Sequence, residues 1–189
     1  RGLFFCIVGA RFDAHDYAWE AVENGCVALI VERFIQMDVP QVRVSNGRAA
    51  MARIAAAFYG HPSRQMRMIG ITGTKGKTTT AHMIKKILEE DGKKVGMIGT
   101  NGAFIGDDKV DLDIRNTTPE SFDLQYLFSV MRKEGCTHVV MEVSSQGLKL
   151  HRVSGIDFDY GVFLNLSPDH ISPNEHATFE EYKECNISK

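Results

Sequence analysis

The chain has 189 residues, of which 43% are hydrophobic and 24% are charged, and its formal net charge is -2 at pH 7. This composition is typical of a globular protein with a buried core, and the small net charge gives no general attraction to nucleic acid or membrane surfaces. No apolar run approaches the roughly 20 residues that cross a bilayer, and the four cysteines form no closely spaced pair. We therefore expect a soluble, monomeric, cytoplasmic protein that neither enters a membrane nor binds nucleic acid.

Strands and helices alternate in the first part of the chain. Apolar runs predict strands over residues 3–8, 27–31 and 39–44, and a helix over 17–24 that ends at Gly25 in a left-handed cap. Ser45 and Asn46 are possible N-caps of a second helix. One face of that helix carries Met51, Ile54, Ala55 and Phe58. It ends at residues 60–63, whose Gly, Pro and Ser favour a domain boundary there.

The second part repeats the alternation. Strands are expected over residues 68–72, 95–98, 138–143 and 160–166. One helix is expected over 77–91, and a second is opened by Thr118-Pro119-Glu120. The apolar face of this second helix consists of Leu124, Leu127, Phe128 and Met131. Such alternation predicts an α/β fold with a parallel, doubly wound sheet, whose ligands gather at the carboxyl ends of the strands.

A turn rich in Gly, Thr and Lys joins the strand over 68–72 to the helix that follows it. Backbone N–H groups at such a turn can surround phosphate oxygens, Lys77 can reach the outer phosphates, and the Thr78 hydroxyl can bind Mg²⁺. The general P-loop pattern has glycine at the position of Ile71. A tight turn before an amphipathic helix is the alternative, but the strand, loop and helix context favours nucleotide binding.

Polar side chains follow two later strands. Glu142 lies at the end of one strand, and Asn165-Leu166-Ser167-Pro168-Asp169-His170 ends the other. A strand-end glutamate is often only solvated, and a lone loop histidine is more often structural than a ligand. Because the carboxyl ends of parallel strands share one edge, Thr78, Glu142 and His170 can converge there beside the nucleotide.

The segment Gly73-Thr74-x-Gly76-Lys77-Thr78-Thr79 resembles the phosphate loop of the Mur ligases, in which Ile71 is normal and Asn commonly stands in place of Lys75. The resemblance implies that ATP is bound by Gly73, Thr74, Lys75, Gly76, Lys77, Thr78 and Thr79. It also implies that Thr78 and Glu142 bind Mg²⁺ and that His170 helps to hold a second Mg²⁺. Lys77, Glu142 and His170 are then the catalytic residues.

Two further segments resemble the Mur ligases that add the third amino acid. Asn116-Thr117-Thr118-Pro119 is similar to their substrate loop, and residues 144–152 are similar to a second substrate segment. The implied substrate-binding residues are Thr117, Thr118, Ser144 and Arg152. Alternatively, the two threonines cap the following helix and Arg152 forms a surface ion pair. Residues 3–25 resemble the family's uridine-nucleotide domain, with 9–12 nearest the uracil.

The chain departs from the family pattern at Gln146, at Asn186, and in the loop around Asp169-His170, where Pro168 and residues 172–176 differ from the usual sequence. Gln146 stands where the family commonly has His, and Asn186, four residues after Tyr182, stands where it usually carries a carbamylated lysine that bridges two Mg²⁺ ions. A carbamate offers two anionic oxygens, whereas Asn offers one neutral carbonyl. We hypothesise that the second Mg²⁺ is weakly held or absent, unless Lys189 takes the role after a shift of helix register.

Taken together, the resemblance implies a P-loop ATPase-like domain with a parallel sheet, preceded by a smaller α/β uridine-nucleotide-binding domain. Residues 1–63 would belong to the UDP-substrate domain and 64–189 to the ATP domain, and the C-terminal ligase domain would be absent. The implied reaction joins an amino acid to a UDP-N-acetylmuramoyl dipeptide through an acyl phosphate, in peptidoglycan precursor synthesis. The alternatives are another Mur or folylpolyglutamate-type ligase and a non-catalytic nucleotide-binding paralogue.

Overall fold

The computed structural model describes residues 2–9, 12–167, 176 and 178–187. The chain forms two compact units, residues 1–51 and 52–189. The division between them falls inside helix α2 (Gly47–Phe58), which Asn46 caps by accepting a hydrogen bond from the Ala49 backbone N–H at 2.8 Å. The domain limits 1–63 and 64–189 remain a prediction.

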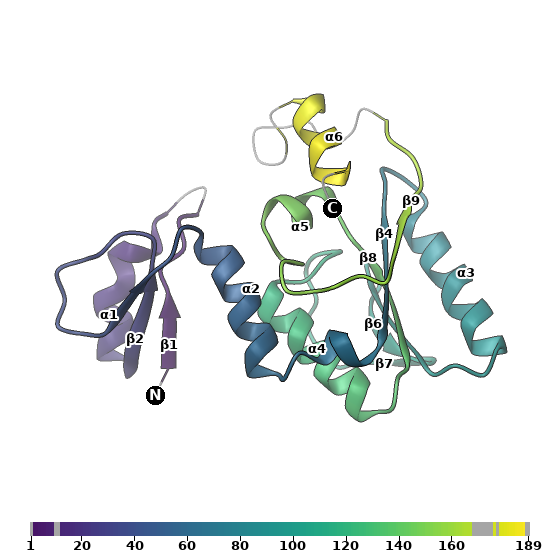
Figure 1. Cartoon of the computed structure of the whole chain (residues 1–189), viewed down its shortest axis with the longest axis horizontal. Coiled ribbons are helices and arrows are strands. Elements are labelled where there is room, and N and C mark those ends of the chain that lie inside the picture. Colours follow the sequence, from purple (N-terminus) through teal and green to yellow (C-terminus); the bar gives the residue numbers. More distant parts are fainter. Residues whose placement is uncertain (1, 10–11, 168–175, 177, 188–189) are drawn as a thin grey trace. The chain divides into compact units, whose positions relative to one another are not determined.

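The first unit is built on a small parallel sheet, in the order β1-β2-β3 (Figure 1). Its strands are β1 (Gly2–Phe5), β2 (Cys26–Val31) and β3 (Gln41–Arg43). A 3-10 turn (Ala14–Tyr17) leads into α1 (Ala18–Glu23), and Gly25 follows with φ 90°, as predicted. The strand predicted over 3–8 ends at Phe5, because the chain folds back where Ala14 N donates to Ile7 O at 3.1 Å.

A buried histidine ties the loop before α1 to the end of β2. The His15 side chain is almost fully buried, its Nδ1 lies 2.6 Å from Asp13 Oδ1, and its Nε2 accepts from the Glu32 backbone N–H at 3.1 Å. Nε2 is therefore the acceptor and Nδ1 carries the proton. Hydrogen bonds from the His15 backbone N–H and the Arg33 guanidinium hold the pKa of Asp13 below its ordinary value. Residues 13 and 15 thus have a structural role in this unit.

The second unit contains a six-stranded sheet in the order β7-β6-β5-β8-β4-β9. Four strands are parallel, namely β4 (Arg67–Thr72), β5 (Val95–Gly99), β8 (His138–Glu142) and β9 (Tyr160–Phe163). They confirm the four strands expected in this region. The edge hairpin of β6 (Gly102–Ile105) and β7 (Asp108–Lys109) is antiparallel and was not predicted, because such short strands carry no clear alternation.

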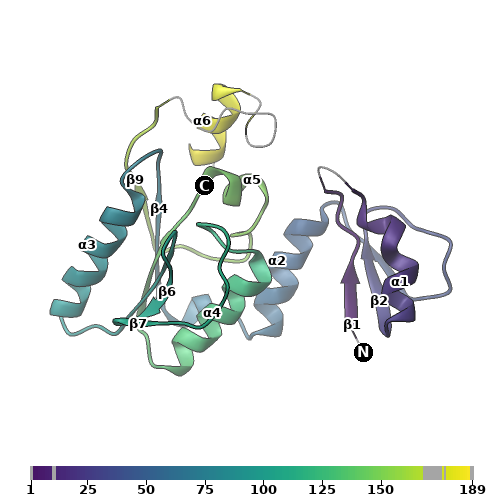
Figure 2. The ribbon, with the colours of Figure 1, turned by 180° about the vertical axis from the view of Figure 1, so that it is seen from behind.

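Two helices cover opposite faces of this sheet (Figure 2). Helix α3 (Lys77–Glu90) packs on Ile69, Met97 and Val140, and α4 (Ser121–Lys133) packs on their strand neighbours Met68, Ile98 and Met141. Successive strand residues point to opposite faces, so each strand supplies both cores. The apolar face predicted for α4 is confirmed, with Leu124, Leu127, Phe128 and Met131 fully buried.

The start of α4 corrects one expectation. The helix begins at Ser121 with Glu120 at its N-cap position, and no side chain caps it. The Thr118 hydroxyl instead donates to the Glu142 carbonyl at 3.1 Å, so the helix cap considered as an alternative role for Thr117 and Thr118 does not form. The extended backbone at Glu120 delays the helix and leaves both threonines in the preceding loop.

Strand register brings the loops that contain the predicted site residues to one edge. Ile71 of β4 lies opposite Glu142 of β8, and Thr72 lies opposite Phe163 of β9. The short helices α5 (Ser145–Lys149) and α6 (Phe179–Ile187) contact each other, and a 3-10 turn (Pro62–Gln65) leads into β4.

Among the described residues, no helix is long and apolar enough to span a membrane.

Candidate active site

The phosphate loop connects β4 to α3 through two glycines in the left-handed region. Gly73 has φ 140° and Gly76 has φ 87°, conformations that other residues rarely adopt. A Cβ at Gly73 would also lie 3.1 Å from the backbone of Asn165. Gly76 is the N-cap of α3, and no side chain caps that helix end. The first turn of α3 thus presents backbone N–H groups and partial positive charge, the arrangement that binds phosphate.

Lys77 is the first residue of α3 and folds back over this loop. Its Nζ donates to the Gly73 carbonyl at 2.5 Å and to the Thr74 carbonyl at 3.2 Å. The ammonium group therefore contacts the backbone of the loop itself. Thr79 is exposed on the first turn of the helix and Lys75 is exposed at the tip of the loop.

The segment that follows β9 holds the loop from the other side. The Asn165 side chain accepts from the Lys75 backbone N–H at 3.0 Å and donates to the Lys75 carbonyl at 2.9 Å. The Asn165 carbonyl accepts from Thr74 N at 3.1 Å. Asn165 was not predicted as a site residue, although it opens the motif that was quoted for His170. His170 itself lies outside the described residues.

Glu142 and two threonines form a cluster of oxygen atoms at the strand ends. Thr78 Oγ1 donates to Glu142 Oε2 at 3.0 Å, Thr100 Oγ1 donates to the same oxygen at 3.2 Å, and Thr100 N donates to Oε1 at 3.1 Å. Glu142 is 2% exposed. A buried carboxylate beside a hydroxyl at a phosphate loop is the hard-oxygen environment that Mg²⁺ prefers, so these residues fit the ion. No group of three His, Cys, Asp or Glu side chains within the described ranges could hold a metal.

Gly99 makes room for this carboxylate. A Cβ at Gly99, the last residue of β5, would overlap the Glu142 side chain. Thr100 follows directly and supplies two of the hydrogen bonds to Glu142. Neither residue was predicted, because nothing in their local sequence shows that β5 lies next to β8.

The predicted substrate loop is hydrogen-bonded to the same strand ends. Thr118 is fully buried, and its Oγ1 accepts from Ser144 N at 2.9 Å and lies 3.1 Å from Ser144 Oγ. Ser144 Oγ accepts from Gly147 N at 3.1 Å and so caps α5. Thr117 Oγ1 lies 3.1 Å from Thr100 Oγ1. The loops after β5 and β8 and the loop before α4 therefore form one connected structure.

Arg152 holds this loop through contacts with Thr118 and Glu120. Its side chain is 7% exposed, Nη1 donates to the Thr118 carbonyl at 3.0 Å, and Nη2 lies 2.7 Å from Glu120 Oε1. Arg152 does form an ion pair, but its own guanidinium is buried and only the Glu120 side chain, 37% exposed, reaches solvent, unlike the surface pair considered as an alternative. Removal of its guanidinium would leave a buried carbonyl and a carboxylate without this partner.

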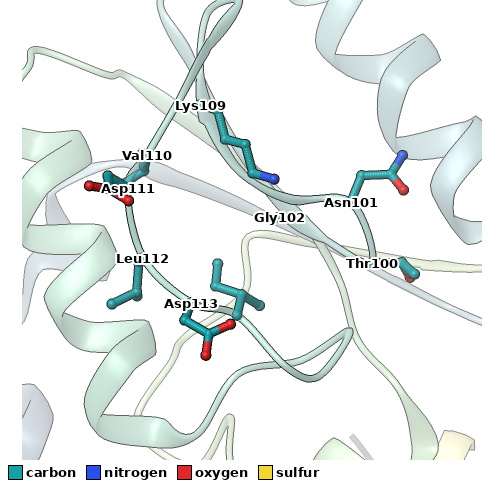
Figure 3. A pocket seen from close by; sticks show the side chains of 9 residues that line it. Thr100, Asn101, Gly102, Lys109, Val110, Asp111, Leu112 and Asp113 are labelled. Atoms are coloured by element: carbon teal, nitrogen blue, oxygen red, sulfur yellow. The ribbon is translucent and has the colours of Figure 1, made fainter.

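One cavity of about 230 Å³ is lined by residues from both predicted groups, the nucleotide-binding and the substrate-binding residues. Its lining includes Gly73 and Lys77 from the phosphate loop, and Thr117, Ser144 and Arg152 from the substrate segments. Ser145, His176 and Tyr182 also line it and were not predicted; His176 Nε2 lies 2.9 Å from Ser145 Oγ. A more open cavity of about 540 Å³ lies next to Thr100, between residues 100–102 and 109–114 (Figure 3).

Known proteins are similar to this chain over most of its length. Residues 71–188 match the family model of the Mur ligase middle domain. The chain is 50% identical, over 182 residues, to the UDP-N-acetylmuramoyl-L-alanyl-D-glutamate–2,6-diaminopimelate ligase of Halalkalibacterium halodurans, with 96% of this chain and 37% of that protein covered. It is 49% identical over 181 residues to the ligase of the same name from Geobacillus thermodenitrificans, with 96% and 36% covered. The chain thus spans little more than a third of the length of these relatives.

Solved structures share the fold. A UDP-N-acetylmuramoyl-L-alanyl-D-glutamate–2,6-diaminopimelate ligase superimposes with a TM-score of 0.80 at 26% identity, covering 97% of this chain and 37% of that one. The MurF ligase of Thermotoga maritima in complex with ADP gives 0.58 at 25% identity, covering 99% and 39%. These similarities confirm the predicted fold class. Since the family model also matches more than half of its residues, the chain belongs to the Mur ligase family.

Proposed function

We propose that this chain carries the nucleotide-binding part of an ATP-dependent amide ligase that adds the third amino acid to a UDP-N-acetylmuramoyl dipeptide in peptidoglycan precursor synthesis. The observation that carries the proposal is the shared cavity, which places Lys77 together with Thr117, Ser144 and Arg152. A ligase of this kind must bring a triphosphate and a substrate carboxylate together, and one cavity with both groups of residues suits that task.

The names of the relatives guide the choice of substrate. They are ligases of UDP-N-acetylmuramoyl-L-alanyl-D-glutamate and 2,6-diaminopimelate, at 49–50% identity over 96% of this chain. We therefore propose 2,6-diaminopimelate as the incoming amino acid and the cytoplasm as the place of reaction. The ADP complex of the related MurF ligase supports ATP as the nucleotide.

The residues around the phosphate loop would bind and orient the nucleotide. Residues 73–79 would surround the phosphates with backbone N–H groups, and the Lys77 ammonium would leave the loop carbonyls to contact the outer phosphates. Thr78 and Glu142 would hold Mg²⁺, which supplies positive charge where two anions must approach each other. Amide formation would then proceed through an acyl phosphate on the substrate carboxylate.

The predicted substrate-binding residues have two kinds of role: some contact the substrate, and others hold the loop in position. Thr117 and Ser144 line the cavity, whereas Thr118 is fully buried and its hydroxyl is occupied by Ser144 and Glu142. We propose that Thr117 and Ser144 contact the muramoyl-peptide. Arg152 lines the cavity as well and holds the Thr118 carbonyl, so it both faces the substrate and positions the loop.

The second Mg²⁺ is proposed to be weakly held. Asn186 lies on α6, where the family usually carries a carbamylated lysine. One neutral carbonyl is a weaker bridge for a hard cation than a carbamate. His170 and Lys189, the other residues of this proposal, lie outside the described residues.

Replacement of Lys77 by Ala should weaken Mg²⁺-dependent ATP binding by tenfold or more, because a charge-assisted contact contributes roughly 1.5 to 3 kcal/mol. Calorimetry on the full-length protein measures this. Lys86→Ala is the matched control, since Lys86 lies on the same helix but is 71% exposed and pairs with Glu90. Equal affinity of Lys77→Ala and wild type for ATP would contradict the assignment of the phosphate loop.

Replacement of Gly99 by Ala should raise the Mg²⁺ concentration needed for half-maximal activity by about tenfold, because the new Cβ displaces the Glu142 carboxylate. The dependence of phosphate release on Mg²⁺ concentration provides the measurement. Gly161→Ala on β9 is the control, since a Cβ there meets nothing within 4 Å. If both variants show the wild-type dependence on Mg²⁺, Glu142 is not a ligand of the ion.

The proposed reaction is tested by phosphate release from ATP in the presence of UDP-muramoyl dipeptide and either 2,6-diaminopimelate or lysine. We expect release with diaminopimelate, and a KM for the UDP substrate that rises about tenfold in Arg152→Ala while the affinity for ATP stays unchanged. Arg64→Ala is the control and should behave as wild type. Arg64 lies in the turn before β4, at the amino ends of the parallel strands, and its side chain is 62% exposed. ATP binding without release with any amino acid would favour the non-catalytic paralogue.

A further inference from the structure

Tyr182 is a buried residue of the cavity that the mechanism above does not use. It belongs to α6 and is 1% exposed, and it lines the cavity together with Gly73 and Lys77. Its hydroxyl oxygen lies 2.9 Å from Thr74 Oγ1, across 108 residues of sequence. A tyrosine so deeply buried needs a partner for its hydroxyl, and here that partner is part of the phosphate loop.

Ser167 contacts the same Thr74 hydroxyl. Thr74 Oγ1 accepts from Ser167 N at 3.0 Å and lies 3.3 Å from the Ser167 carbonyl, to which it can donate. A threonine hydroxyl has one proton and two lone pairs, so it can take part in all three contacts with Ser167 and Tyr182. The Tyr182 hydroxyl thus completes the hydrogen bonding of Thr74.

Packing holds the Tyr182 ring in place. The His176 ring lies edge-on to it with centroids 5.3 Å apart, and Phe179 lies 6.3 Å away. Helix α6 is in turn fixed to α5 by an ion pair of 2.8 Å between Lys149 and Glu181. A ring held in this way presents its hydroxyl at a defined point, so Tyr182 is a fixed hydrogen-bond partner of the loop.

Thr74 transmits this constraint to the phosphate-binding lysine. The Thr74 carbonyl accepts from Lys77 Nζ at 3.2 Å, and Thr74 N donates to the Asn165 carbonyl at 3.1 Å. The orientation of the Thr74 peptide therefore sets one of the two carbonyls on which the ammonium group lies. A rotation of Thr74 would move that carbonyl and change the position from which Lys77 reaches a phosphate.

We propose that Tyr182 is a positioning residue for the nucleotide: through Thr74 it holds the phosphate loop in the shape that binds a nucleoside triphosphate. This inference rests on the proposed nucleotide site and adds α6 to it. It assigns Tyr182 no contact with the phosphates. The loss of its hydroxyl should therefore affect nucleotide affinity and leave the chemical step and the binding of the UDP substrate unchanged.

Tyr182→Phe in the full-length protein removes the hydroxyl and keeps the ring. We expect the Kd for Mg²⁺-ADP, measured by calorimetry, and the KM for ATP to rise together by about threefold to tenfold, the effect of one hydrogen bond. The values of kcat and of KM for UDP-muramoyl dipeptide should stay within about twofold of the wild-type values. Tyr160→Phe, on β9 and 61% exposed, is the matched control and should leave both nucleotide constants unchanged.

Thr74→Val tests the same hydrogen bond from its other end and, with Tyr182→Phe, completes a double-mutant cycle. If Tyr182 acts through Thr74, the double variant binds Mg²⁺-ADP as weakly as Thr74→Val alone. The inference is overturned if Tyr182→Phe binds as wild type, or if its full effect persists in the Thr74→Val background. A wild-type protein that binds no nucleotide would instead overturn the proposed function itself, which separates the two failures.

Discussion

The Glu142 carboxylate, buried at the carboxyl ends of the parallel strands, is the group around which the site is organised. A buried carboxylate is unfavourable unless hydrogen bonds or cations compensate for lost hydration. Here the compensation comes from Thr78 on α3 and from the backbone and hydroxyl of Thr100 after β5. The Glu142 carbonyl also accepts from Thr118 of the substrate loop. Glu142 thus connects the proposed phosphate loop, the neighbouring strand end and the proposed substrate loop to each other.

A second set of contacts holds the phosphate loop from the side of β9. The Asn165 side chain hydrogen-bonds to both the backbone N–H and the carbonyl of Lys75. The Thr74 hydroxyl hydrogen-bonds to Ser167 and Tyr182. The Glu142 contacts reach the loop at the start of α3, whereas these reach its tip. The loop is therefore held both at its tip and where α3 begins, which restricts the conformations that it can adopt.

Sequence patterns predicted the parts of the site that depend on local order. The phosphate loop follows from a strand, glycines and a helix start within one short stretch, and the meeting of Thr78 and Glu142 follows from the shared edge of parallel strands. Thr100, Asn165 and Tyr182 escaped prediction because their partners are 42, 90 and 108 residues away. The cap considered for Thr118 does not form for a related reason. Its local pattern suits a helix cap, but its hydroxyl bonds to Glu142 and Ser144 at a neighbouring strand end.

In our proposal, Thr78 and Glu142 hold the metal that accompanies the nucleotide. Crystals of the full-length protein, grown with Mn²⁺ and a non-hydrolysable ATP analogue, reveal the position of this metal by anomalous scattering. We expect a full-occupancy peak in place of the hydrogen bond between Thr78 Oγ1 and Glu142 Oε2, in contact with the hydroxyl and the phosphates and held by the carboxylate. A metal bound to the phosphates elsewhere, with that hydrogen bond intact, would show that Thr78 and Glu142 do not hold it.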